Sequence, residues 1–248
     1  IVDLDKAEAA IRRAVDAAEQ MAGVTVESLI VTQTSGRISS EAFGAKIDLD
    51  TGTVRDGDIK RVLAASGRHQ IKQGRTALHA LPIGYTLDGQ HGIRDPRGMV
   101  GDVLGVDINL VTADRAAQDN LALVINRCHL DVDAIVATPY AAGLASLVDD
   151  EGELGAVCVD IGGGTSSIAI FSEGNLVHVD AVAVGGHHVT MDIAHCLSIR
   201  LEEAERLKTL EGSAIAASAV ERDTLKCGTC AAEVEPPPHV TALDCPFC

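Results

Sequence analysis

Apolar residues at helical spacing open the chain. From Leu4 to Met21 they follow one another at steps of three and four residues, Asp3 or Asp5 can cap the first turn, and Gly23 can end the last. The pattern predicts an amphipathic helix over these residues, followed by a short strand over 28–32.

The character of the sequence changes over residues 34–111. Glycine, threonine, aspartate and short β-branched runs alternate there, with one helical stretch near 58–65. This pattern predicts a small α+β unit inserted between helix-rich flanks. After the insertion, a helix is expected to begin with Thr112 as its N-cap and to run to about Cys128.

Two further elements precede a charged stretch. The apolar run 134–137 predicts a buried strand, and Pro139 can start a helix that continues to Val148. The charged residues 149–153 predict a surface turn.

A three-stranded meander is the most regular feature of the sequence. Its strands are predicted over 156–160, 166–171 and 176–184. Gly185 and Gly186 interrupt the sheet, and helices are expected from there to Leu197 and over 201–210.

The turn between the first two strands of the meander can bind phosphate. Gly162, Gly163 and Gly164 carry no Cβ, so their N–H groups can approach an anion closely, and Thr165 adds a hydroxyl donor. Asp160, at the end of the strand, can bind the waters of a Mg²⁺ ion. A glycine-rich hairpin turn without a ligand is the alternative. The flanking aspartate and threonine favour phosphate, although the turn is neither a Walker A loop, which needs lysine, nor a Rossmann turn, which leads into a helix.

Charge and composition exclude several classes of function. The net charge of −16 repels nucleic acid and anionic lipid, and the aromatic content of 2% leaves few surfaces on which bases could stack. No apolar run reaches the ~18 residues that a membrane span needs, and no signal peptide is recognisable. The composition predicts a folded cytoplasmic protein that does not bind nucleic acid.

Cysteines form two groups. Cys128, Cys158 and Cys196 stand singly in apolar surroundings and are expected to be reduced, buried thiols. The other four have the paired spacing of a zinc ribbon: Cys227, Cys230, Cys245 and Cys248. Free thiols or a redox-active pair are the alternatives for this tail.

Residues 159–170 resemble the second phosphate loop of the actin-like ATPase superfamily. Within it, further segments are similar to the FtsA family of bacterial cell division proteins: 78–85, 92–98, 153–155, 189–194 and 204–208. The resemblance covers about residues 1–225 and implies an incomplete α/β fold of the actin-like (ribonuclease H-like) type. The implied parts are a first domain (1–33 and 112–152), an inserted interaction subdomain (34–111), a second domain (153–225) and a cysteine-rich tail (226–248).

The resemblance also implies roles for individual residues. Gly162, Gly163, Gly164 and Thr165 would contact the phosphates of ATP, Asp160 would lie near Mg²⁺, and Gly185 and Gly186 would approach the nucleotide. Glu205 and Lys208 would contact its ribose and adenine side, although a solvated helical ion pair is the alternative for these two. His187, His188 and His195 are expected to be structural or surface residues rather than metal ligands.

The function implied by the resemblance is that of a cell division adaptor. Such a protein binds ATP as a conformational ligand, assembles into actin-like filaments, links FtsZ to the inner membrane at the septum and recruits later divisome proteins. Thr138 stands where related hydrolases have an acid, which implies at most slow ATP hydrolysis and no catalytic residue in the chain.

The same resemblance places further parts of the family's site outside the chain. A first phosphate loop would precede Ile1, and the adenosine-binding glycines and a membrane-binding amphipathic helix would follow residue 225. Two other functions remain open at this point. One is an actin-fold phosphotransferase, and the other is a degenerate scaffold that carries a zinc-ribbon interaction tail.

Overall fold

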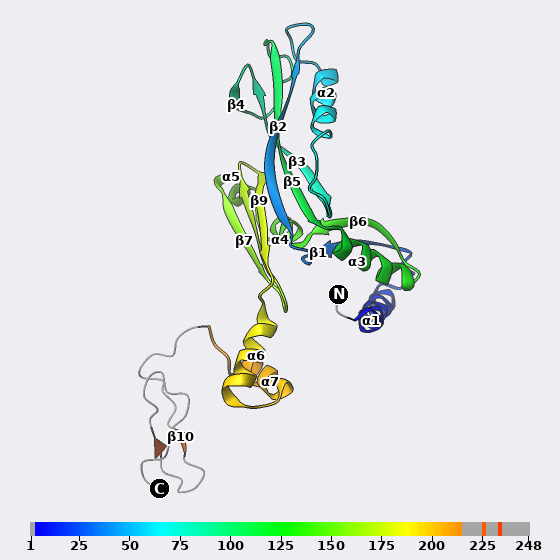
Figure 1. Cartoon of the computed structure of the whole chain (residues 1–248), viewed down its shortest axis with the longest axis vertical. Helices are drawn as coiled ribbons and strands as arrows, with labels where there is room; N and C mark the ends of the chain where they lie inside the picture. Colours follow the sequence, from blue (N-terminus) through cyan, green and yellow to red (C-terminus); the bar gives the residue numbers. More distant parts are fainter. Residues whose placement is uncertain (1–2, 215–224, 227–232, 235–248) are drawn as a thin grey trace. The chain divides into compact units, whose positions relative to one another are not determined.

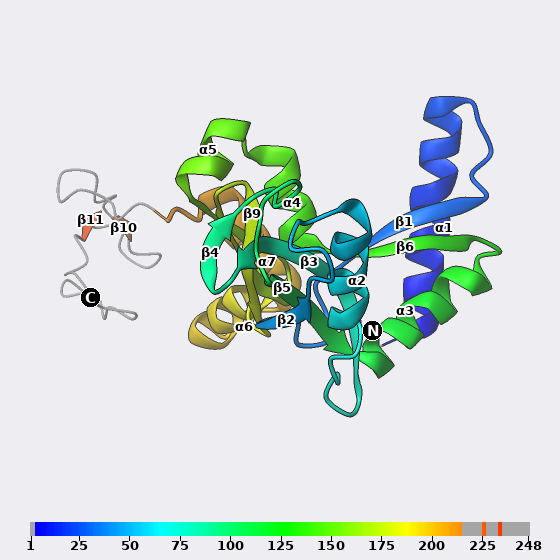
Figure 2. The ribbon, with the colours of Figure 1, turned by 90° about the horizontal axis from the view of Figure 1, so that it is seen from above.

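The computed structural model describes residues 3–214 and two short strands, 225–226 and 233–234. The chain divides into two units, Ile1–Gly185 and Gly186–Cys248, and each is described by itself (Figures 1 and 2). The predicted tail cysteines Cys227, Cys230, Cys245 and Cys248 lie outside the described residues.

Helix α1 (Leu4–Ala22) begins and ends as its sequence predicts. The Asp3 side chain accepts the backbone N–H of Lys6 at 3.0 Å, and Gly23 ends the helix in the left-handed conformation, with φ 70°. Apolar residues of α1 pack on α3 (Arg115–Arg127) and on the residues that follow it. This cluster contains Ile11, Val15, Ile125, Cys128 and Leu130.

Strands β1 (Ser28–Gln33) and β6 (Asp131–Ala137) form a parallel two-stranded sheet. Gln33 pairs with Ala137, so both strands end at the same edge. Thr34 and Thr138 follow directly, and Thr138 is the first residue of α4 (Thr138–Ser146). The two threonine hydroxyls are 2.9 Å apart and hydrogen bonded.

Seven antiparallel strands form the main sheet of the first unit, in the order β4-β3-β5-β2-β9-β8-β7. Their bounds are β2 Ser39–Asp48, β3 Arg75–Leu87, β4 Gln90–Ile93, β5 Val103–Asp114, β7 Ala156–Ile161, β8 Ser166–Ser172 and β9 Asn175–Val182. Helix α2 (Asp56–Ser66) covers β2 and β5 (Figure 1), and the buried Ile59 and Val62 pack there against Leu104, Val106 and Ile108. The predicted insertion therefore contains a helix and strands, as its sequence indicates.

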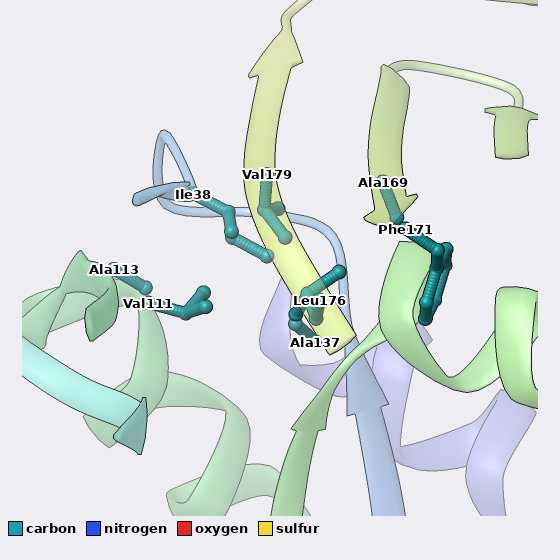
Figure 3. Packing of buried hydrophobic residues seen from close by; sticks show 8 residues of the cluster. All are labelled: Ile38, Val111, Ala113, Ala137, Ala169, Phe171, Leu176 and Val179. Carbon is teal, nitrogen blue, oxygen red and sulfur yellow. The ribbon is translucent and has the colours of Figure 1, made fainter. Parts of the chain in front are cut away.

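A second apolar cluster joins the inserted strands to the meander of β7, β8 and β9. Figure 3 shows its eight buried members: Ile38, Val111, Ala113, Ala137, Ala169, Phe171, Leu176 and Val179. The Phe171 ring lies against Gly143 of α4, where a Cβ would collide with it. Two hydrogen bonds reinforce the junction, from Asn109 Nδ2 to Leu176 O at 2.8 Å and from Val179 N–H to Ser40 Oγ at 2.8 Å.

Two predicted assignments are wrong, and two predicted ends lie two residues too late, because α4 ends at Ser146 and β9 at Val182. Thr112 does not cap a helix, because β5 continues its pairing with β2 and β3 through this residue, and α3 begins only at Arg115. The charged run 149–153 is not a turn but lies in a short helix, α5 (Asp149–Leu154). Its acidic residues stand in the first turn, where they interact favourably with the helix dipole, and Glu151 Oε2 accepts the Val148 N–H at 3.1 Å.

The second unit contains α6 (Gly186–Leu197) and α7 (Leu201–Glu211), which pack against each other. Thr190 of α6 and Ala204 of α7 are buried. The short strands β10 (Leu225–Lys226) and β11 (Glu233–Val234) pair antiparallel. In the described part of the chain, no helix combines the length and the apolar character that crossing a membrane requires.

Candidate functional site

The glycine turn lies between two paired strands, as the sequence predicts. Strands β7 and β8 pair up to Ile161 and Ser166, and the four residues 162–165 connect them. The Gly162 N–H donates to the Thr165 carbonyl oxygen at 2.8 Å, which closes the turn. The backbone between these two residues is therefore held by the sheet on both sides.

Gly163 and Gly164 have no structural reason to be glycine. Neither has a φ in the left-handed region, and a Cβ added to either would meet no atom within 4 Å. Both residues are exposed. The backbone N–H groups of both residues are therefore open to close approach by an anion.

Gly185 lies directly against the same turn. A Cβ at Gly185 would collide with Gly162 O and would come within 2.8 Å of the carbonyl carbon and oxygen of Gly163. Nearby, Ser166 Oγ donates to the Val184 carbonyl oxygen at 2.7 Å. The structure thus brings the predicted residue Gly185 into direct contact with the turn, and only glycine fits there.

Asp160 stands on β7, one residue before the end of the strand. It is half-buried and pairs in register with Ser167 of β8, whose Oγ donates to Asp160 Oδ2 at 3.4 Å. A single carboxylate at this position could hold Mg²⁺ through its waters, because Mg²⁺ keeps several waters when it binds to proteins. Within the described residues, no three His, Cys, Asp or Glu side chains gather to hold a metal by themselves.

The predicted pair Glu205 and Lys208 belongs to the second unit and is more than a solvated ion pair. Lys208 Nζ donates to Glu205 Oε2 at 2.8 Å, and both side chains reach the Thr190 hydroxyl on α6. Hydrogen bonds from Lys208 and Thr190 lower the pKa of Glu205 despite the opposing effect of burial. Sequence reasoning missed Thr190, because a threonine within a helix carries no chemical signature of its own.

A groove of about 390 Å³ runs between α6 and α7 beside this pair. Its walls are mainly apolar, and they include Val189, Ile193, Leu197 and Leu207 together with Lys208. The volume is within the range of small-molecule sites.

The other residues singled out in the sequence are Gly186, three histidines and three single cysteines. Gly186 begins α6, and its carbonyl oxygen accepts from Lys208 Nζ at 3.2 Å. His187, His188 and His195 also lie on α6. Of the three single cysteines, Cys128 is buried and Cys158 half-buried. Cys196 is exposed, so the expectation of a buried thiol is wrong there, because its side chain lines the open groove between α6 and α7.

Two family models match the sequence, one described as cell division protein FtsA over residues 157–239 and one as the SHS2 domain inserted in FtsA over residues 35–112. Cell division protein FtsA of Rhizobium meliloti is 56% identical over 225 residues, which are 91% of this chain and 51% of that protein. FtsA of Pseudomonas aeruginosa is 36% identical over 226 residues, 91% of this chain and 54% of that protein.

The chain spans about half the length of these curated relatives. Among solved structures, a chain of the PilM–PilN type IV pilus biogenesis complex superposes with a TM-score of 0.54. That match covers 82% of this chain and 56% of the other at 14% identity, and it concerns the fold alone. The fold is of the actin-like type, and the chain belongs to the FtsA family of cell division proteins.

Proposed function

We propose that the chain binds an adenine nucleotide, with the phosphates on the turn 162–165. The observation that carries the proposal is the pair Gly163 and Gly164, whose missing side chains serve neither the backbone conformation nor the packing. Family membership supports the same reading, because the fold is that of actin-like ATPases.

Each part of the site has a task in this proposal. The N–H groups of Gly163 and Gly164 and the hydroxyl of Thr165 bind phosphate oxygens, and Gly185 supports the turn from behind. Asp160 holds waters of Mg²⁺, and the ion neutralises phosphate charge when it is bound. The family resemblance implies a ribose-side role for Glu205 and Lys208, and within the second unit Lys208 Nζ donates to both Glu205 and the Gly186 carbonyl oxygen.

Nucleotide acts in this proposal as a conformational ligand rather than as a substrate that is turned over. Thr138, at the carboxyl ends of β1 and β6, donates or accepts through a hydroxyl and cannot act as a general base at neutral pH. We therefore expect ATP hydrolysis to be slow at most. ATP affinity that differs between two conformations would then set the balance between them.

The wider role follows from the family. We propose that the intact protein assembles into actin-like filaments, links FtsZ to the cytoplasmic face of the inner membrane at the septum and recruits later division proteins. The proposed parts are the first domain (1–33 and 112–152), the inserted interaction subdomain (34–111), the second domain (153–225) and the tail (226–248). The match of the inserted SHS2 domain to residues 35–112 supports the inserted subdomain at 34–111.

A glycine substitution tests nucleotide binding at the turn. Gly163→Val places a branched side chain where the phosphates would lie, and since a Cβ at this position meets no atom within 4 Å, the fold should be retained. We expect the affinity for ATP with Mg²⁺, measured by isothermal titration calorimetry, to fall at least about tenfold, as for the loss of one charge-assisted hydrogen bond.

Gly57→Val is the matched control. Gly57 is exposed, a Cβ there also meets no atom within 4 Å, and the residue lies on α2, away from the turn. This variant should bind ATP like the unmodified chain. Equal ATP affinity of Gly163→Val and Gly57→Val would contradict the proposed phosphate site.

A further inference from the structure

Ser166 is the first residue of β8 and directly follows the glycine turn. It pairs with Ile161 of β7 on one side and with Val182 of β9 on the other. Strand β9 ends at Val182, so the pairing of the two strands stops there. The Ser166 side chain extends the connection, because its Oγ donates to the Val184 carbonyl oxygen at 2.7 Å, the usual length of an O–H···O hydrogen bond.

This hydrogen bond holds the residue that precedes Gly185. Gly185 is buried and lies against the glycine turn. A Cβ on Gly185 would collide with Gly162 O and would come within 2.8 Å of the carbonyl carbon and oxygen of Gly163. All of these residues belong to the first unit, so Ser166 fixes a contact that lies within one compact part of the chain.

The contact with Gly185 sets the direction of the Gly163 N–H group. Gly162 O is the atom nearest to the Cβ position of Gly185, and the carbonyl carbon of Gly162 is not among the three nearest, so the oxygen points toward Gly185. A trans peptide unit directs its C=O and its N–H to opposite sides, and the described residues contain no cis peptide bond. The Gly163 N–H therefore points away from Gly185. Gly163 is itself exposed, so an anion can approach this group.

We propose that Ser166 is a positioning residue for phosphate binding. By holding Val184 it keeps Gly185 against the turn, and Gly185 keeps the Gly163 N–H directed outward. The inference rests on the proposed function and adds to it a residue that does not touch the ligand. An N–H group whose direction is fixed before binding needs no ordering when the phosphate arrives, so less conformational entropy is lost on binding.

The test compares side chains at residue 166 with and without a hydroxyl. Dissociation constants for ATP with Mg²⁺ are measured by isothermal titration calorimetry on the chain, on Ser166→Ala and on Ser166→Thr. We expect Ser166→Ala to weaken ATP binding about threefold to tenfold, the usual effect of one neutral hydrogen bond, and Ser166→Thr to retain the affinity. Ser166→Cys, whose thiol is a weak donor, should show the same loss and replaces Ser166→Ala should that variant fail to fold.

Ser172→Ala is the matched control on the same strand. Ser172 is the last residue of β8, it is exposed, and its hydroxyl makes no hydrogen bond within the described part of the chain. This variant should bind ATP like the unmodified chain. If Ser166→Ala bound ATP as tightly as Ser172→Ala and only its free energy of unfolding fell, the role of Ser166 would be purely structural and the inference would be overturned.

A measurement without nucleotide separates this inference from the proposed function. The carbonyl ¹³C signal of Val184 should shift in Ser166→Ala, which removes its hydrogen-bond donor, and stay near its place in Ser166→Thr. An unchanged Val184 signal in Ser166→Ala would overturn the hydrogen bond on which the inference depends. A chain that binds no ATP overturns the proposed function and the binding role of Ser166 with it. A chain that binds ATP, and whose Ser166→Ala variant keeps the full affinity, overturns only the role of Ser166.

Discussion

Gly185→Ala tests most directly whether Gly185 lies against the glycine turn, residues 162–165. The added methyl group would collide with Gly162 O and approach the Gly163 carbonyl carbon and oxygen to 2.8 Å. All three are backbone atoms of a turn that is closed by the hydrogen bond from Gly162 to Thr165 and fixed by the pairing of β7 with β8. The turn therefore has to move as a whole, because no flexible side chain can give way.

The expected cost follows from this rigidity. Overpacking of a well-packed site typically destabilises a protein by about 1–3 kcal/mol, and here the strain falls on the residues that would bind phosphate. We expect Gly185→Ala to lower the free energy of unfolding by about that amount, measured by urea denaturation followed by circular dichroism. ATP affinity should fall as well, since displaced N–H groups no longer point at the phosphates.

Gly57→Ala is the control for adding a methyl group at a glycine. A Cβ at Gly57 meets no atom within 4 Å, and the residue lies in helix α2, where alanine is preferred to glycine. Its stability should equal or exceed that of the unmodified chain. If Gly185→Ala were as stable as Gly57→Ala and bound ATP unchanged, the close contact between Gly185 and the turn would be refuted.

Three further predictions concern the core, a histidine and the tail. Phe171→Ala should lower the free energy of unfolding by about 3–5 kcal/mol, because it empties a site that is 5% exposed beside Gly143; a loss below 1 kcal/mol in the same urea assay would contradict that packing. His79 Nε2 accepts the Ala137 N–H at 3.0 Å, and burial lowers the pKa of His79 below its ordinary value of 6.5. The unfolded chain therefore binds the proton more readily, so stability should be full above pH 6.5 and fall as the pH drops below it, and His79→Gln should flatten this dependence. The purified chain should contain about one zinc per molecule by elemental analysis if Cys227, Cys230, Cys245 and Cys248 form a ribbon, and less than about a tenth of an equivalent would exclude one.

Local sequence signals predicted those parts of the fold that local interactions determine. The cap at Asp3, the left-handed Gly23 and the meander from Ala156 to Val182 follow from helical periodicity, capping chemistry and short alternating strands. Thr112 was misassigned because its place depends on pairing with β2 and β3, which are distant in the sequence. The sequence around Thr112 allows both a cap and a strand, and only the sheet decides between them.

The candidate site also combines features that local sequence predicts with features that only tertiary contacts determine. Glycines in a turn between two strands are visible in the sequence, and so is the spacing of Glu205 and Lys208 on one helix face. Two other features depend on how distant segments pack. One is the collision that a Cβ at Gly185 would make with the turn, and the other is the position of the Thr190 hydroxyl between Glu205 and Lys208. Both arise from tertiary contacts that no spacing rule contains.

The central claim is that the backbone of the glycine turn binds the phosphates of an adenine nucleotide. It is tested most directly by NMR of the backbone amides while ATP and Mg²⁺ are added to the ¹⁵N-labelled chain. The account predicts large, saturable shifts of the Gly163 and Gly164 amide signals, with smaller ones at Gly57 of α2. Saturable binding of ATP that leaves the signals of Gly163 and Gly164 in place would contradict it.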